Sequence, residues 1–195
     1  MNKGRLEAFS DGVMAILITI MVLELRRPEG SNWEALVERV PILLTYILSF
    51  VFLGIYWNNH HHLLQATERI NGRILWANLH LLFWLSLTPF AMGWMGEYPS
   101  ASAPSAAYGT VLMCAGIAYW ILQHQIVAAQ PPHSKLRTAL GRDLKGNISP
   151  VLYLAGIVFA FVNQWISDAI YVSVALMWLV PDPRIERLGL GQTRD

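Results

Sequence analysis

Long apolar runs separated by short polar links dominate the chain. A helix rises about 1.5 Å per residue, so a run of about 20 apolar residues can cross a bilayer. The candidate segments cover residues 6–26, 41–64, 72–96, 106–128, 148–166 and 168–181. The last two are short and nearly continuous, and the polar residues between Asn163 and Asp168 are expected to turn them into a hairpin. The pattern predicts a single all-α membrane domain, 1–195, with six transmembrane helices per subunit.

Two features modify this pattern. Pro89 should kink the third segment, and the hydroxyl of Ser86 or Thr88 can then bond a freed carbonyl. The link at 27–40 contains an amphipathic stretch, "WEALVERV", that follows the loop residues Pro28, Gly30, Ser31 and Asn32.

Composition agrees with a membrane protein. The chain is 54% hydrophobic and 14% charged, whereas soluble domains carry about 25% charged residues. A net charge of +1 gives no reason to expect nucleic-acid binding. The one cysteine, Cys114, excludes an intrachain disulfide and a cysteine-based metal cluster.

The distribution of Lys and Arg predicts the orientation. With the N-terminus in the cytoplasm, eleven of the 14 basic residues fall on the cytoplasmic side. Only Arg26, Arg27 and Arg39 then lie outside. This bias follows the positive-inside rule. It predicts a multi-pass protein of the cell membrane with both termini cytoplasmic.

The first segment combines an apolar stripe with a polar beginning. At 100° per residue, the stripe comprises Ile16, Thr19, Ile20 and Leu23. Periodicity alone explains it as helix packing. Ser10 and Asp11 point elsewhere, and they can either cap the helix or join a buried polar network. We favour the network, because a carboxylate inside a membrane bundle usually needs a partner.

A second polar cluster, "YWNNHHHLLQ" at 56–65, lies at the same end of the membrane as Asp11. Its side chains include donors that an aspartate can use, among them Trp57, His60 and His61. Three adjacent histidines point in different directions on a helix, so no metal site is expected. A single histidine could still ligate a haem, and a haem- or quinone-binding membrane protein is one alternative.

Several absences narrow the function. The chain has no phosphate-binding loop and no nucleophile elbow, so we expect neither an enzyme nor a cofactor. It also lacks a "TVGYG"-like stretch that could form a carbonyl filter. Ionisable groups are rare in the middle of the segments, which argues against proton coupling. A small-solute or ion transporter nevertheless stays open as an alternative.

Three motifs resemble one family. The pattern R-x-x-x-F-S-D at Arg5, Phe9, Ser10 and Asp11 continues as "FSDGVMAILITIMVLEL", and "YWNNHH" at 56–61 and "LSLTPF" at 85–90 follow. Together they resemble the endolysosomal potassium channel, transmembrane protein 175, in its prokaryotic form. The resemblance implies a homotetramer in the lipid bilayer, with four first helices around a central pore. It also implies a leak-type, potassium-selective channel without a carbonyl filter, with K⁺ as the permeant ion.

The resemblance also implies roles for particular residues. The pore positions are those of the apolar stripe, Ile16, Thr19, Ile20 and Leu23. Ile16 would form the cytoplasm-proximal hydrophobic constriction, and Thr19 would supply a hydroxyl layer. A polar network behind the pore would hold the first helix in place. Its implied members are Arg5, Phe9, Ser10, Asp11, Trp57, His60 and His61.

Overall fold

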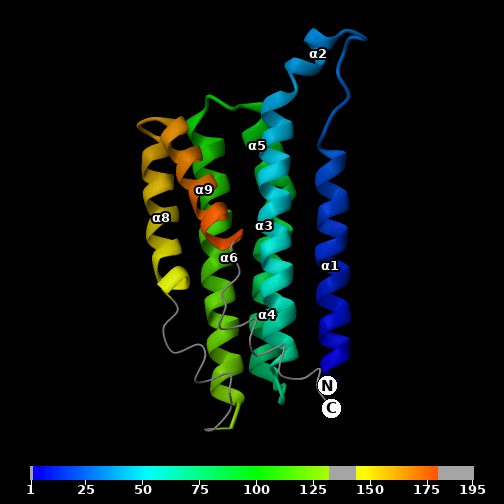
Figure 1. Ribbon diagram of the computed structural model, residues 1–195, viewed down its shortest axis with the longest axis vertical. Coiled ribbons are helices and arrows are strands. Elements are labelled where there is room, and N and C mark those ends of the chain that lie inside the picture. Colours follow the sequence, from blue (N-terminus) through cyan, green and yellow to red (C-terminus); the bar gives the residue numbers. More distant parts are fainter. Residues whose placement is uncertain (1, 132–143, 180–195) are drawn as a thin grey trace.

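A computed structural model describes residues 2–131 and 144–179, which form a bundle of α-helices (Figure 1). The helices in these residues are α1 (Lys3–Leu23), α2 (Trp33–Val37), α3 (Val40–Gln65), α4 (Gly72–Ser86), α5 (Thr88–Glu97), α6 (Ser102–Ala129), α8 (Leu144–Ala160) and α9 (Gln164–Leu179). The amphipathic stretch of the first link forms the short helix α2. The basic residues of 132–143 and of the tail from 180 onward lie outside the described residues.

Four of the predicted membrane segments are long and apolar enough to cross a bilayer. They are α1, α3, α6 and the segment Gly72–Glu97 that α4 and α5 form together. The third segment breaks at Leu87, and Pro89 occupies the first turn of α5, as the sequence predicts. Ser86 donates its hydroxyl to the Phe83 carbonyl at 2.7 Å, which satisfies one acceptor near the break.

The boundary of the last hairpin differs from the prediction. The turn lies at 161–163, so α8 ends at Ala160 and α9 already begins at Gln164. Asn163 accepts the Trp165 amide on its side chain and the Ile166 amide on its carbonyl, which starts the helix early. With 17 and 16 residues, each helix is about 25 Å long and shorter than the hydrocarbon core.

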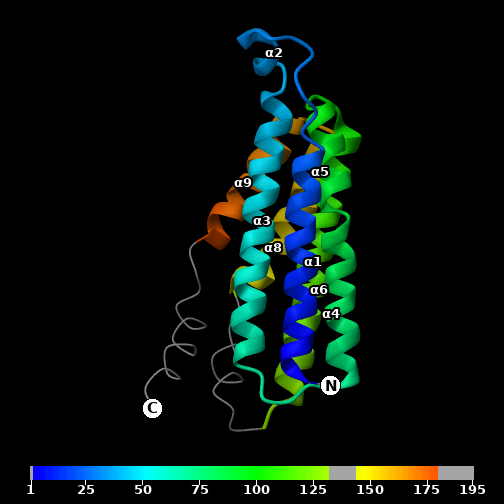
Figure 2. The same cartoon turned by 90° about the vertical axis from the view of Figure 1, so that its right-hand side faces the viewer.

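Helix α1 lies at the edge of the bundle, beside α3, α4 and α5 (Figure 2). The Asn2 side chain accepts the Gly4 amide and caps its first turn, so neither Ser10 nor Asp11 is the cap. One face of α1 is buried at helical spacing. It comprises Leu6, Ser10, Met14, Leu17 and Met21. The other described residues leave the opposite face uncovered.

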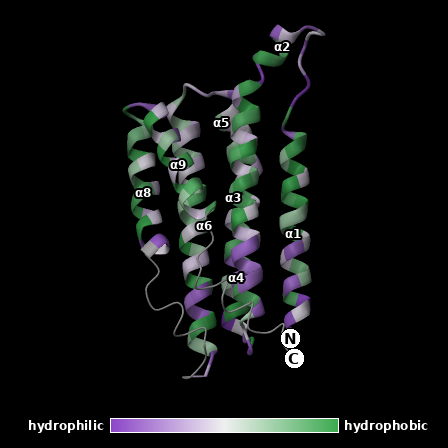
Figure 3. Cartoon of the chain, in the orientation of Figure 1, coloured by the Kyte–Doolittle hydropathy of each residue, from purple (hydrophilic) through white to green (hydrophobic). Residues whose placement is uncertain are grey.

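The bundle has a polar end and an apolar body. Figure 3 shows hydrophilic residues concentrated where α1 starts and where α3 and α6 end, whereas the upper part is mostly hydrophobic. Helices α8 and α9 lie beside the upper part of α6 (Figure 1). The link that contains α2, at the opposite end, is also hydrophilic, so an apolar body lies between two polar ends (Figure 3).

Tyr171 fastens the α8–α9 hairpin to α6. Its ring is fully buried and lies against Gly109 of α6 and Gly156 of α8, where a Cβ atom would collide with it. Its hydroxyl donates to the Ser105 carbonyl at 3.1 Å. The Ser105 hydroxyl also contacts Ser167 at 3.0 Å and Asp168 at 3.1 Å. Gly109 and Gly156 therefore leave the space into which the Tyr171 ring fits.

We expect Gly109→Ala to destabilise the protein by about 1–3 kcal/mol, because the added methyl group displaces the Tyr171 ring. Thermal unfolding of the purified protein in detergent measures this effect. Gly54→Ala is the matched control, since a Cβ atom there meets nothing within 4 Å and alanine favours the helix. Equal melting temperatures for the two variants would show that the close fit of the Tyr171 ring against Gly109 does not stabilise the protein.

Candidate functional site

The apolar stripe predicted on the first helix forms the uncovered face of α1. Ile16 is 59% exposed, Leu23 is 74% exposed and Ile20 is 39% exposed, and Thr19 is exposed between them. Gly12 continues this face toward the start of the helix, where a Cβ atom would meet nothing within 4 Å. An apolar face of this size requires lipid or another protein surface against it. We call Ile16, Thr19, Ile20 and Leu23 the outward stripe.

Thr19 is the only residue of the outward stripe with a hydroxyl group, and this hydroxyl already donates its hydrogen within the helix. The hydroxyl donates to the Ala15 carbonyl one turn earlier, at 3.0 Å. A hydroxyl oxygen that donates its hydrogen retains lone pairs, and these can face a cation. The local helix geometry therefore makes Thr19 an acceptor toward the outside.

Behind the stripe, three buried side chains form a hydrogen-bonded chain across three helices. Asn78 of α4 donates its amide hydrogen to Ser10 Oγ at 3.0 Å, and Ser10 donates to the Leu6 carbonyl at 2.9 Å. His60 Nε2 of α3 lies 2.7 Å from Asn78 Oδ1. Because that amide oxygen can only accept, His60 carries its proton on Nε2. Each of the three side chains is at most 1% exposed.

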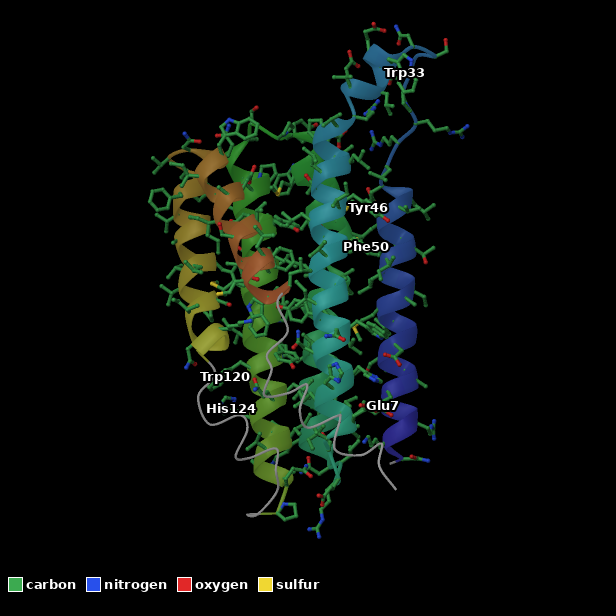
Figure 4. All side chains as sticks on the ribbon, in the orientation of Figure 1. Glu7, Trp33, Tyr46, Phe50, Trp120 and His124 are labelled. Carbon is green, nitrogen blue, oxygen red and sulfur yellow. The ribbon has the colours of Figure 1, made fainter. Side chains whose placement is uncertain are left out.

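A second polar contact lies beside this chain, nearer the surface. Trp57 Nε1 of α3 donates to Asp11 Oδ1 at 3.0 Å. The Trp57 ring stacks on His61, with centroids 6.0 Å apart and planes 23° apart. Glu7 lies one helical turn before Asp11, at the same end of α1 (Figure 4). Helix α1 is thus bonded to α3 directly and to α4 through Ser10.

These contacts include most but not all of the predicted network residues. Ser10, Asp11, Trp57 and His60 take part in hydrogen bonds, and His61 takes part by stacking. Arg5 is exposed and Phe9 is 52% exposed, on the same side of α1 as the outward stripe. No hydrogen bond or ion pair joins the Arg5 side chain to the other described residues. Within one chain, these two residues therefore stand apart from the network.

Sequence reasoning missed the central member, Asn78. The sequence shows that Asn78 lies inside the third apolar segment, but it does not show that Ser10 and His60 are its hydrogen-bond partners. An amide buried in an apolar helix needs hydrogen bonds to offset its desolvation, and this requirement was the available signal. Of the three adjacent histidines, His60 turns to Asn78 and His61 stacks on Trp57, while the rings of His61 and His62 meet edge to face with centroids 5.5 Å apart. Across residues 2–131 and 144–179, no three His, Cys, Asp or Glu side chains are grouped to hold a metal.

Comparison with known proteins gives the family. The family described as "Endosomal/lysosomal potassium channel TMEM175" matches residues 5–89, which include most of α1 and the whole polar network. A potassium channel of Chryseobacterium sp. (strain P1-3) is 54% identical over 187 residues, which is 96% of this chain and 97% of that protein. The chain belongs to the TMEM175 family. The alignment with the Chryseobacterium protein extends through both α1 and the α8–α9 hairpin.

Other TMEM175 proteins extend the comparison. The crystal structure of a lysosomal potassium-selective channel TMEM175 homologue from Chamaesiphon minutus superposes with a TM-score of 0.80 at 26% identity. The superposition covers 90% of this chain and 95% of that one. The zebrafish endosomal/lysosomal proton channel TMEM175 is 28% identical over 119 residues, which is 58% of this chain and 22% of the animal protein. The bacterial channels therefore match this chain over its length, whereas the animal protein is much longer.

We expect Asn78→Ala to destabilise the protein by about 1–3 kcal/mol, because it leaves the buried Ser10 and His60 groups without their partner. Thermal unfolding in detergent measures the loss. Asn58→Ala is the matched control, since it removes the same side chain from the nearby half-buried Asn58, outside the network. A variant Asn78→Ala as stable as Asn58→Ala would mean that the chain of hydrogen bonds does not hold α1.

Proposed function

We propose that this protein is a potassium-selective, leak-type channel of the cell membrane. In this proposal four copies assemble around an axis, and the outward stripe of each α1 lines a central pore. The observation that carries the proposal is the exposed apolar face of α1, held outward by a buried network in a TMEM175 protein. The 54% identity to a bacterial protein named a potassium channel supports K⁺ as the permeant ion.

The side chains of the stripe support an ion path that lacks a carbonyl filter. Four copies of Ile16 and Leu23 would form two apolar rings, separated by a ring of Thr19 hydroxyls. A cation that enters an apolar ring loses hydration at high cost, and a narrow apolar ring can also close by dewetting. The lone pairs of Thr19 would replace part of the lost hydration. A constriction of this kind favours K⁺, whose water is more easily removed than that of Na⁺.

Proton conduction is the function named for the animal relatives. The stripe offers no relay for protons, because none of Ile16, Thr19, Ile20 and Leu23 is ionisable. Potassium is therefore the better-supported ion for this chain. A reversal potential that follows the pH gradient, and not the K⁺ gradient, would overturn this assignment.

The proposed topology has six membrane helices and both termini in the cytoplasm. The distribution of Lys and Arg supports the orientation. The α8–α9 hairpin would complete the count of six, although each of its helices is short. A hairpin docked through Tyr171 can remain in the membrane because it satisfies its polar side chains against α6.

We expect Ile16→Ala or Leu23→Ala to widen the pore, raise its conductance and reduce its preference for K⁺ over Na⁺. Reversal potentials in planar bilayers, with K⁺ on one side and Na⁺ on the other, measure the preference. Ile18→Ala is the matched control, since the same truncation is made on the half-buried flank of the same helix. Unchanged conductance and selectivity in both stripe variants would make the stripe a packing face.

We expect Asp11→Asn to lower the assembled fraction or the current. The substitution removes the charge that strengthens the hydrogen bond from Trp57 and leaves the geometry of the side chain intact. Size-exclusion chromatography and single-channel recording of the purified variant measure the two effects. A fully assembled, normally conducting variant would show that this contact does not position α1.

A further inference from the structure

The structure contains a groove that the proposed pore does not use. It lies between the first half of α4 and the second half of α6, at the polar end of the bundle, and has a volume of about 770 Å³. Its walls are formed by Asn71, Gly72, Arg73, Trp76, Ala77, His80, Ile121 and Gln125. None of these residues belongs to the outward stripe or to the polar network.

The polar side chains of this groove are mainly hydrogen-bond donors. Arg73 brings a guanidinium and Trp76 an indole N–H, which can only donate, and the amide of Gln125 can donate as well; no carboxylate of residues 2–131 or 144–179 lines the walls. Among the described residues, nothing forms an ion pair or hydrogen bond with the Arg73 side chain. A charged donor with no counter-charge beside it is complementary to an anion.

The contact between His80 and Trp84 adds a further donor. Trp84 Nε1 donates to His80 Nε2 at 2.9 Å. A neutral imidazole that accepts on Nε2 carries its hydrogen on Nδ1. His80 therefore donates from Nδ1, and it lies two helical turns after Arg73 on α4. The groove thus offers donors along about 10 Å of α4.

An apolar strip continues from the groove along the outside of the same helix. Trp76 is 76% exposed, and Leu79 and Phe83 are 43% and 55% exposed further along α4. Arginine and tryptophan at the end of a membrane helix lie at the level of the lipid headgroups. The groove therefore presents donors at headgroup level and an apolar surface toward the membrane centre. A soluble anion would use only the first of these features.

We propose that this groove binds an anionic phospholipid of the leaflet on the N-terminal side. The phosphodiester would accept hydrogen bonds from Arg73 and Trp76, an ester carbonyl of the lipid would accept one from His80 further along α4, and the acyl chains would lie along Leu79 and Phe83. Basic pockets between membrane helices bind anionic headgroups in this way. The site is independent of the pore, so it stands or fails separately from the proposed channel activity.

Native mass spectrometry of the purified full chain tests the site, with phosphatidylglycerol and phosphatidylcholine as probes. We expect preferential retention of phosphatidylglycerol, and we expect Arg73→Ala to weaken its affinity at least fivefold. Arg27→Ala is the matched control, because it removes the same charge from an exposed residue in the link after α1, at the other end of the bundle from the groove. It should change the affinity less than twofold. Arg73→Gln, which keeps donors but loses the charge, should bind the two lipids alike.

Three results would overturn the assignment. Equal affinity of the wild-type protein for both lipids would remove the role of charge. Full displacement by soluble glycerol phosphate at an equal concentration would identify a soluble anion as the occupant. Unchanged lipid retention in Arg73→Ala, together with a shift in the distribution of oligomers, would mean that a second copy of the chain fills the groove. A melting temperature of Arg73→Ala equal to that of the wild type in lipid-free detergent shows that the variant is folded.

Discussion

The buried hydrogen bonds between Ser10, Asn78 and His60 determine how α1 is rotated within the bundle. These groups lie out of reach of solvent, and a buried polar group without a partner costs about 1–3 kcal/mol. Rotating α1 by a single residue position, or 100°, would remove Ser10 from Asn78. The contact between Asp11 and Trp57 adds a second point of attachment on α3. Everything proposed for the opposite face depends on this fixed rotation.

The fixed rotation gives the two faces of α1 different roles. The face that contains Ser10 and Met14 is buried against the subunit, and the face that contains Ile16 and Leu23 is presented outward. Ser10 and Asp11 are tolerated near the start of α1 because α4 and α3 satisfy them, and neither residue caps the helix. The remaining helices pack on the buried side of α1, and the α8–α9 hairpin is attached to α6 through the Tyr171 ring, which fits against Gly109 and Gly156.

The sequence predicted the fold where local patterns decide the structure. The segments at α1, α3 and α6 could be located because their apolar runs are long, and the outward stripe followed from helical spacing. The turn before α9 was misplaced because Ser167 and Asp168 are polar and lie where a link was expected. Both are inside α9, where Ser105 of α6 satisfies them. Such a partner, 62 residues away for Ser167, cannot be deduced from local composition.

The candidate site shows the same limit. Ser10, Asp11 and Trp57 could be singled out because polar groups at the end of an apolar helix need an explanation. Asn78 was overlooked because its partners come from two other helices. Arg5 was expected in the network on the basis of the motif, yet the helix directs it to the outward side. Motifs identify which residues matter, whereas three-dimensional packing decides what each one contacts.

Cysteine accessibility tests the central claim, that the outward face of α1 lines the ion path, most directly. In a Cys114→Ser background, Ile16→Cys and Met14→Cys place a thiol on the outward and the buried face of the same helix. A positively charged methanethiosulfonate reagent would be added during recording of K⁺ current in planar bilayers. We predict an irreversible loss of current for Ile16→Cys and no change for Met14→Cys. Current that persists in Ile16→Cys after complete modification of its thiol would contradict the account.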